Sequence, residues 1–255
     1  MENLLNKIHF ADCLDILRQL PDKSVDMLLQ DPPYGSMQCD WDKSVSIPEM
    51  WAEWERVIKD NGAMIFTAQN PFSADLIVSK RNLFRYSLVW DKVLPTGFLD
   101  ANKKPLRAHE DILVFYKSLP NYNPQFSVGE KYKKPKGRIE KNQYGAYGER
   151  PNGGVNEDGK RFPTSIISIS NADRNKEVGH PTQKPVDLFR YLIRTYSSPG
   201  DVVFDGYSGS GTTAVAAQME GRRFIVCENH LPYFEASQAR LSNLVAAPYL
   251  FSNIG

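Results

Sequence analysis

Short apolar runs alternate with amphipathic ones near both ends of this 255-residue chain. Apolar or alternating patterns of strand length predict β-strands over Lys7–Phe10, Ser24–Gln30, Ala63–Thr67, Tyr86–Trp90, Asp111–Tyr116, Asp201–Asp205 and Arg223–Val226. Helical spacing, with its capping and breaking residues, predicts helices over Asp12–Leu20, Trp51–Ile58, Pro185–Tyr196 and Thr213–Glu220. Strands that alternate with helices indicate an α/β fold with a mostly parallel, doubly wound sheet.

The alternation breaks in the middle of the chain. The segment Leu94–Arg107 is rich in Gly, Pro, Asn and Lys, which predicts an irregular loop between two strands. Residues 118–165 contain Lys, Tyr, Gly, Pro and Asn with few aliphatic side chains, which favours an inserted, loop-rich segment. We therefore expect residues 1–117 and 166–255 to form two halves of one core, with residues 118–165 inserted between them.

Composition narrows the class of protein. Apolar residues make up 41% of the chain, which suits a buried core, and the 31 basic and 30 acidic residues nearly cancel, so that any positive surface has to be local. The three cysteines show no disulfide or metal-ligand spacing, and we expect no metal. No stretch approaches the roughly 20 apolar residues of a membrane span. These features predict a soluble protein of the reducing cytoplasm with no membrane partner.

A glycine-rich turn follows the strand predicted over Asp201–Asp205. Glycine allows the backbone to approach a ligand closely, and Glu228 at the end of the next strand can accept hydrogen bonds from ribose hydroxyls. The turn thus predicts an adenosine-binding site, although it also fits a dinucleotide fingerprint, so an NAD-dependent oxidoreductase stays an alternative. The candidate contacts in this turn are Asp205, Gly206, Tyr207, Ser208, Gly209, Gly211 and Thr212.

The strand over Ser24–Gln30 runs into the tetrapeptide Asp31-Pro32-Pro33-Tyr34. Two successive prolines fix the backbone and remove two N–H donors, which leaves a rigid turn with outward carbonyl groups. Asp31 and the carbonyl of Pro32 can hold both N–H bonds of a planar amino group, and Tyr34 can stack on a base flipped out of a duplex. The tetrapeptide favours methyl transfer to an exocyclic amine, with an ordinary strand-ending turn as the alternative.

With these two motifs in this order, the sequence resembles the β class of DNA amino-methyltransferases, the N-4/N-6 DNA methylase family, over most of its length. The resemblance implies a Rossmann-like methyltransferase fold with permuted motif order and S-adenosylmethionine as cofactor. It also implies that Asp31, Pro32, Pro33 and Tyr34 are catalytic. In that family Asp-Pro-Pro-Tyr resembles an adenine-N6 signature, whereas cytosine-N4 enzymes more often have serine at the first position.

Two further segments are similar to family motifs. His180-Pro181-Thr182-Gln183-Lys184-Pro185 matches the motif before the cofactor loop, which implies that Thr182 and Lys184 lie near the methionine end of the cofactor. The stretch Ala11–Cys13 resembles the family's Gly-Asp-Cys segment, which lies near the adenine of the cofactor. This resemblance implies a cofactor contact for Asp12. Helix capping is an equally simple role for these residues.

The inserted segment and the loop before it carry more basic than acidic residues, with tyrosines between them. This pattern suits phosphate contacts and stacking on duplex DNA, and it coincides with the family's target-recognition position. A solvated loop is the alternative. The candidate DNA-binding residues are Lys103, Lys104, Lys131, Lys133, Lys134, Lys136, Arg138 and Lys141.

Together these features predict a site-specific methyltransferase that acts by direct displacement on N6 of a flipped-out adenine in duplex DNA. Cytosine-N4 methylation is the first alternative, and methylation of an RNA or protein amine is a weaker one. The resemblance leaves open a homodimer and a cognate restriction endonuclease as partners.

Overall fold

The computed structural model of the chain describes residues 1–34, 46–133, 155–172 and 183–246. It consists of two compact units, one formed by residues 1–123 and 165–255 and the other by residues 124–164. The larger unit contains the two motifs identified from the sequence. Residues 118–123, which we expected in the inserted segment, belong to this larger unit.

The larger unit is built on one eight-stranded sheet with the strand order β1-β12-β11-β2-β3-β5-β4-β10. Its strands are β1 (Lys7–Phe10), β2 (Val25–Gln30), β3 (Ile58–Ala68), β4 (Phe84–Thr96), β5 (Arg107–Phe115), β10 (Ile166–Ser168), β11 (Val202–Asp205) and β12 (Arg223–Glu228). All neighbouring pairs are parallel except for β5, which is antiparallel to both β3 and β4. The mostly parallel α/β fold expected from the sequence is confirmed.

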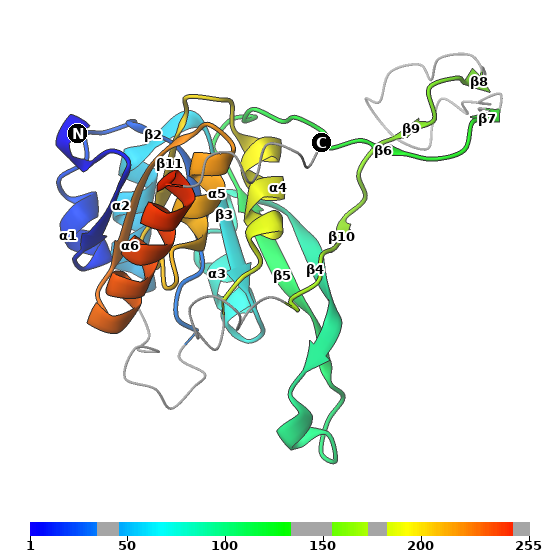
Figure 1. The fold of residues 1–255 in the computed structure, drawn as a ribbon, viewed down its shortest axis with the longest axis horizontal. Helices are drawn as coiled ribbons and strands as arrows, with labels where there is room; N and C mark the ends of the chain where they lie inside the picture. Colours follow the sequence, from blue (N-terminus) through cyan, green and yellow to red (C-terminus); the bar gives the residue numbers. More distant parts are fainter. Residues whose placement is uncertain (35–45, 134–154, 173–182, 247–255) are drawn as a thin grey trace. The chain divides into compact units, whose positions relative to one another are not determined.

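Helices cover both faces of this sheet (Figure 1). They are α1 (Cys13–Leu17), α2 (Ile47–Val57), α3 (Phe72–Ser79), α4 (Val186–Tyr196), α5 (Thr212–Met219) and α6 (Leu231–Ala246), with short 3-10 turns η1 (Glu2–Leu4) and η2 (Phe98–Asp100). One core cluster unites α1, α2 and α3 with Leu28 and Phe66 of the sheet, and the other unites α4 and α5 with Met27 and Ile65. Successive strand residues thus enter opposite cores, as the pleat requires.

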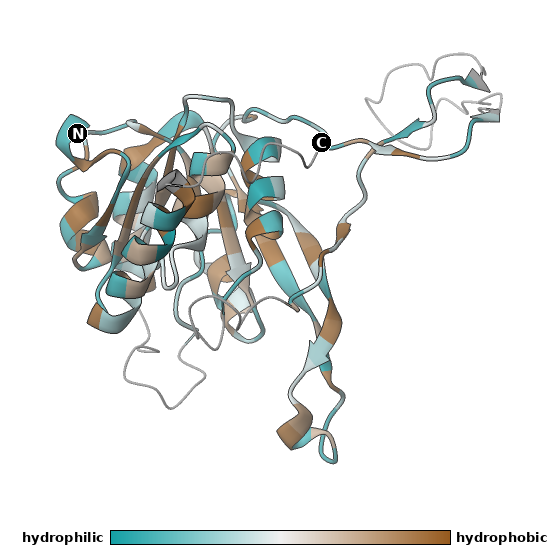
Figure 2. Cartoon of the chain, viewed as in Figure 1, coloured by the Kyte–Doolittle hydropathy of each residue, from teal (hydrophilic) through white to brown (hydrophobic). Residues whose placement is uncertain are grey.

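The hydropathy of each residue follows these layers. Figure 2 shows apolar residues along the strands and on the helix faces that meet the sheet, and polar residues on the outer helix faces. The helix α4 is one such case, because its buried residues Leu188, Phe189, Leu192 and Ile193 recur at helical spacing. Burial of this apolar stripe fixes the helix against the sheet.

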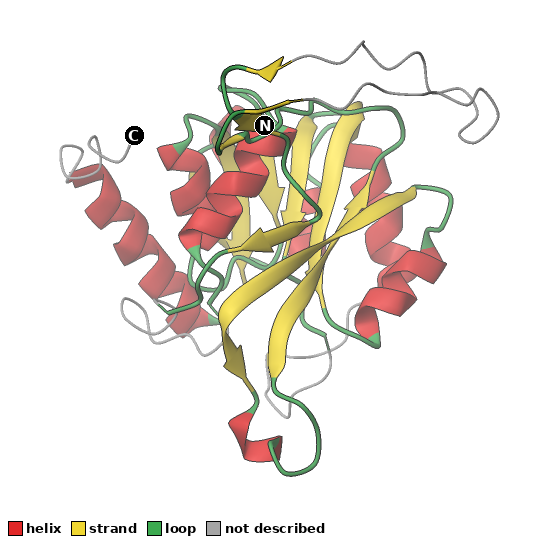
Figure 3. Cartoon of the chain, turned by 90° about the vertical axis from the view of Figure 1, so that its right-hand side faces the viewer, coloured by secondary structure: helices red, strands yellow, loops and turns green. Residues whose placement is uncertain are grey.

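Several elements differ from the sequence prediction. The segment Leu94–Arg107, expected to be irregular, is so over residues 97–106, where η2 lies at the tip of the β4–β5 hairpin (Figure 3). The flanking strands reach farther than predicted, because β4 continues to Thr96, which pairs with Arg107 after a register shift. Helix α1 ends at Leu17 instead of Leu20, while α3 and α6 were not predicted.

The smaller unit contains two short antiparallel pairs. Strand β6 (Ser127–Val128) pairs with β9 (Lys160–Arg161), and β7 (Tyr132–Lys133) pairs with β8 (Val155–Asn156). The rings of Phe126 and Phe162 lie 4.8 Å apart between their centroids. Among the described residues of this unit, the side chains of Phe126, Val128, Tyr132 and Phe162 are exposed. Within the described ranges, none of the helices has the length and apolar character that crossing a bilayer requires.

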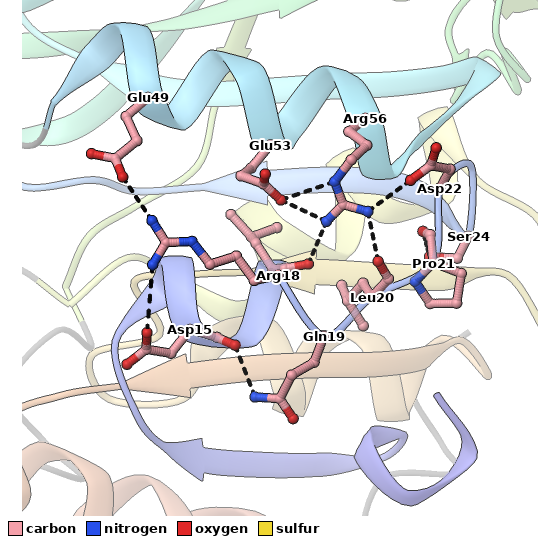
Figure 4. A network of polar contacts seen from close by, with 11 residues as sticks. Asp15, Arg18, Gln19, Leu20, Pro21, Asp22, Ser24, Glu49, Glu53 and Arg56 are labelled. Carbon is pink, nitrogen blue, oxygen red and sulfur yellow. Dashed lines mark hydrogen bonds and ion pairs between the residues drawn. The ribbon is translucent and has the colours of Figure 1, made fainter.

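A polar network joins α1 to α2 beside the first core cluster (Figure 4). The Arg56 guanidinium donates to the carbonyl oxygens of Leu17 and Leu20, at 2.7 Å each, and to the carboxylates of Glu53 and Asp22. Leu17 is the last residue of α1 and Leu20 lies three positions after it, and the Leu17 carbonyl also accepts from the Leu20 N–H at 3.0 Å. Arg56 therefore acts as a cap for a helix that is only five residues long.

We expect Arg56→Met to lower the free energy of unfolding by about 2 kcal/mol, because it removes charge-assisted hydrogen bonds from partly buried carbonyl groups. Urea denaturation followed by circular dichroism measures this loss. Arg18→Met is the matched control, since Arg18 pairs with Asp15 and Glu49 at the exposed surface. Its cost should be about 0.5 kcal/mol or less, and equal losses for both variants would contradict the capping role.

Candidate active site

The strand order brings the two sequence motifs together at one edge of the sheet. Strands β11 and β2 are parallel neighbours, with Phe204 in register with Leu28, so both end at the same edge. Gln30, the last residue of β2, connects the two strands. Its amide nitrogen donates to the Phe204 carbonyl at 2.8 Å, and its amide oxygen accepts from the Gly206 N–H at 3.1 Å. The tetrapeptide and the glycine turn are therefore tied to each other by one buried side chain.

Asp31 follows Gln30, and its carboxylate is held from three sides. The ammonium of Lys184 lies 2.7 Å from both carboxylate oxygens, Oδ1 and Oδ2. The hydroxyl groups of Thr67 and Tyr34 both donate to Oδ1, the second at 3.0 Å. Thr67 comes from the carboxyl end of β3, next to β2. The carboxylate is thus oriented before any substrate arrives.

Tyr34 belongs to the same cluster. Its ring stacks on Phe72 at 5.3 Å between centroids, and its phenol hydrogen-bonds Asp31. Burial and the neighbouring Asp31 carboxylate hold the pKa of Tyr34 well above its usual value, so the phenol keeps its proton. We expected Tyr34 to stack on a target base; its contacts show that one anchor of the ring is Phe72.

Lys184 is a buried cation with acidic neighbours. Burial alone lowers its pKa, but the carboxylates of Asp31 and Glu110 outweigh burial and raise the pKa well above the usual value. Its carbonyl oxygen accepts a hydrogen bond from the hydroxyl of Thr212, the first residue of α5, at 3.2 Å. Lys184, assigned by resemblance to the cofactor's methionine end, therefore links Asp31 to the helix that follows the glycine turn.

The glycine turn between β11 and α5 adopts the conformation that its sequence predicts. Gly209 and Gly211 have positive φ values of 50° and 78°, a region that disfavours side chains. A Cβ atom at Gly206 would overlap the sulfur of Cys13. Asp205 accepts hydrogen bonds from the Tyr207 N–H and the Thr213 hydroxyl, and burial raises its pKa to about 7.

Glu228 closes this turn from the neighbouring strand. Its Oε2 accepts from the Gly209 N–H and its Oε1 from the His230 N–H, at 2.8 Å each. Burial raises its pKa, and hydrogen bonds from the backbone of His230, Gly209 and Asn229 act in the opposite direction. We assigned Glu228 to ribose hydroxyls, and that contact stays a prediction.

Two buried polar atoms near the turn fit a bound polar ligand. Within the described residues, neither the hydroxyl of Ser208 nor the side-chain oxygen of Gln183 has a hydrogen-bond partner. Buried polar groups are rarely left unpaired in folded proteins, so a ligand group or water is the natural partner. Together with the positive-φ glycines, they are compatible with a nucleoside-type ligand.

The remaining candidates for the cofactor site are less distinctive. Asp12 caps α1, because its carboxylate accepts from the Leu14 N–H at 2.9 Å. Tyr207 is partly buried against the core that contains α1. Thr182 lies outside the described residues. The structure thus accounts for Asp12 as a helix cap, and its cofactor contact stays a prediction.

The candidate DNA-binding cations fall in both units. Lys103 and Lys104 are exposed in the β4–β5 hairpin, where Lys104 lies 3.3 Å from the Asp100 carboxylate. Lys131 lies 3.6 Å from Glu157 in the smaller unit, and Lys133 belongs to β7. The others, Lys134, Lys136, Arg138 and Lys141, lie outside the described residues. Their roles stay predictions.

Sequence reasoning missed three residues of the site. Gln30 was counted only as a strand residue, and Glu110 and Lys92 were not singled out, although both are buried and paired at 2.5 Å. The available signal was a polar residue at the end of a strand that otherwise enters the core. Charged residues in strands usually face water, so composition alone does not identify these partners.

Comparison with known proteins gives consistent results along the chain. Residues 25–239 match a DNA methylase family. Over 260 residues the chain is 32% identical to the type II methyltransferase M1.MboII of Moraxella bovis, covering 94% of this chain and 98% of that protein. It is 30% identical over 263 residues to the type II methyltransferase M.BglII of Bacillus subtilis, covering 93% of this chain and 69% of that protein.

Solved structures agree in fold. The complex of M1.HpyAVI with S-adenosylmethionine matches with a TM-score of 0.63 and 23% identity, over 92% of this chain and 98% of that one. The cytosine-N4-specific PvuII DNA methyltransferase matches with a TM-score of 0.64 and 19% identity, over 98% of this chain and 88% of that one. Both likenesses confirm the α/β architecture derived from the strand order.

The buried bridge formed by Gln30 gives a test of the site's construction. We expect Gln30→Met to keep the side-chain volume but to lose both hydrogen bonds, and so to weaken S-adenosylmethionine binding about tenfold, or about 1.4 kcal/mol. Isothermal titration calorimetry measures the affinity. Gln19→Met is the control, because the exposed Gln19 side chain lies just beyond the end of α1 and donates to the Asp15 carbonyl. Unchanged affinity in Gln30→Met would refute the bridge.

Proposed function

The chain belongs to the DNA methylase family that its residues 25–239 match, and on that premise we propose that it methylates N6 of adenine in duplex DNA. As a member of the family of N6 and N4 DNA methylases, the chain is a DNA methyltransferase that uses S-adenosylmethionine. The finer statement, adenine N6, is our proposal. The observation that carries it is the fixed carboxylate of Asp31 next to the glycine turn.

Asp31 acts on the target amino group. The nitrogen lone pair of an exocyclic amine is delocalised into the base, so the amine is a poor nucleophile until its hydrogens are held by acceptors. Asp31 and the Pro32 carbonyl accept these hydrogens and orient the nitrogen. The hydroxyl groups of Thr67 and Tyr34 keep the carboxylate in place for this role, since preorganised groups need no rearrangement during the reaction.

The glycine turn is the cofactor site of this proposal. S-adenosylmethionine supplies a methyl group on a positively charged sulfur. Gly209 and Gly211 allow the backbone to approach the ligand, Glu228 accepts from ribose, and the Ser208 hydroxyl is available for a polar group of the ligand. Gln30 keeps this turn beside Asp31.

Aspartate at position 31 supports adenine over cytosine as the target base. The resemblance described above associates serine at this position more often with cytosine N4. The fold supports neither base over the other, since it is shared with the cytosine-N4-specific PvuII enzyme. Cytosine N4 is thus the second candidate, and the chemistry at Asp31 is the same for both amines.

The β4–β5 hairpin is proposed as a DNA contact. Strand β5 is antiparallel to β3, so the hairpin extends from the edge at which β3 ends and Asp31 lies (Figure 3). At its tip the side chains of Phe98 and Leu99 are exposed by 68% and 102%, and Lys103 and Lys104 follow. Apolar side chains beside cations suit insertion into a duplex whose phosphates bind the lysines.

We expect the native protein to convert unmethylated DNA and S-adenosylmethionine to DNA that contains N6-methyladenine. Asp31→Asn keeps the shape but loses the charge, and should lower the rate by about 100-fold or more. Mass spectrometry of the digested nucleosides identifies the base and measures the rate. Asp60→Asn is the control, since Asp60 pairs with Lys23 at the surface. N4-methylcytosine as the product would contradict the adenine assignment.

For the hairpin, we expect the double variant Phe98→Ala with Leu99→Ala to raise KM for duplex DNA about tenfold, because flipping a base costs a few kcal/mol that inserted side chains offset. A mismatch at the target base should restore most of the loss, since that base is already unpaired. Steady-state kinetics with matched and mismatched duplexes test both effects. Val78→Ala, an exposed apolar control on α3, should leave KM unchanged. Equal loss on both duplexes would contradict the role of the hairpin in flipping.

A further inference from the structure

Four side chains of alternating charge form a buried row that begins at Asp31. Lys184 contacts both oxygens of Asp31 at 2.7 Å and lies 3.4 Å from Oε2 of Glu110, whose Oε1 lies 2.5 Å from Lys92. The residues come from the end of β2, the segment before α4, β5 and β4. Lys92, Glu110 and Lys184 are exposed by only 4% to 7%. Such a row is expensive to bury, which calls for an explanation beyond stability.

The charges persist in the interior. Burial raises the pKa of Glu110, but the ammonium groups of Lys184 and Lys92 outweigh burial and leave the pKa below its usual value. Lys184 keeps its proton for the reciprocal reason, because Asp31 and Glu110 both stabilise its ammonium. Burial lowers the pKa of Lys92, and the Glu110 carboxylate opposes that shift. Lys184 lies between the carboxylates of Asp31 and Glu110.

The contacts of Asp31 limit where a substrate can approach it. Its Oδ1 accepts from Thr67, Tyr34 and Lys184, which exhausts the two lone pairs of that oxygen, and Lys184 also contacts Oδ2. An arriving amino group would therefore use the remaining lone pair of Oδ2, next to the Lys184 ammonium. The amine nitrogen also gains positive charge when it is methylated, and an ammonium beside the same carboxylate would oppose that charge.

Glu110 offers Lys184 a second position. Its Oε2 is buried and accepts no hydrogen bond within the described part of the chain, and it faces Nζ of Lys184 at 3.4 Å. A shift of the ammonium by well under the length of one bond would turn this contact into a hydrogen bond of about 2.8 Å. Lys92 holds the other oxygen, so that the Glu110 carboxylate stays in place when Lys184 moves.

We propose that Glu110 is a positioning residue to which Lys184 transfers when the target amino group binds Asp31. The inference rests on the proposed function, because it assumes an amine substrate at Asp31. In the substrate-free protein Lys184 neutralises and orients Asp31. With the amine bound, Lys184 moves toward Glu110 Oε2, which lengthens its contacts with Asp31, leaves Oδ2 to the amine and moves positive charge away from the reacting nitrogen.

Single-turnover methyl transfer from labelled S-adenosylmethionine to unmethylated DNA tests this inference. Glu110→Gln keeps the shape but removes the charge that attracts Lys184, and should lower the rate constant by about 10-fold to 100-fold. S-adenosylmethionine affinity, measured by calorimetry, should stay within about twofold. Glu220→Gln is the matched control, because Glu220 is a similarly buried carboxylate paired with Arg190 and Arg194. The control should keep the native rate constant.

Two further variants separate positioning from folding. In a Lys184→Met background, Glu110→Gln should cause no additional loss, because Glu110 acts through Lys184. If Glu110→Gln alone fails to fold, the double variant Lys92→Met with Glu110→Gln removes the unpaired buried ammonium and should show the same loss of rate.

The outcomes distinguish this inference from the function on which it rests. A native chain that methylates no DNA contradicts both. An active native chain whose Glu110→Gln variant matches Glu220→Gln contradicts the positioning role alone. The positioning role is also contradicted if Glu110→Gln lowers the rate constant of the Lys184→Met variant as much as it lowers that of the native protein. Glu110 would then act independently of Lys184.

Discussion

The parallel pairing of β2 with β11 is the constraint on which the site depends. The two strands end at the same edge of the sheet, where Gln30 bonds both the end of β11 and the glycine turn, across 174 positions of sequence. Open α/β sheets bind ligands at such carboxyl edges, because the turns there are free of the packing that fills the sheet. In this chain the pairing puts Asp31 beside the glycine turn, and the proposed methyl transfer between two bound molecules requires that arrangement.

Charged and polar side chains around Asp31 are the second feature on which the site depends. The apolar strand ends exclude water, so the charge of Asp31 needs partners from the protein, and Lys184, Thr67 and Tyr34 provide them. A buried ion pair adds little to stability once its desolvation is counted. The row from Asp31 to Lys92 is therefore better explained by the reaction than by folding. It holds the Asp31 carboxylate in one orientation and gives Lys184 a neighbouring acceptor on Glu110.

The parts of this structure that are encoded locally could be predicted from the sequence. Strand and helix periods gave the parallel α/β sheet, and the glycines at 209 and 211 and the two prolines after Asp31 carry the conformations of their turns. Contacts between distant segments could not be predicted. The full length of β4 and β5 depends on cross-strand pairs such as Thr96 with Arg107, and α6 was missed because its apolar spacing is weak. Glu110 and Lys92 are buried only because their charges meet across two strands.

The most direct test of the central claim is a crystal structure with a duplex that contains the methylated site and an unreactive analogue of S-adenosylmethionine. The account predicts the target amino nitrogen within about 3.2 Å of an Asp31 carboxylate oxygen, the nucleoside part of the analogue at the glycine turn, and Lys184 hydrogen-bonded to Glu110. A target base bound elsewhere, with Asp31 still paired to Lys184, would contradict it.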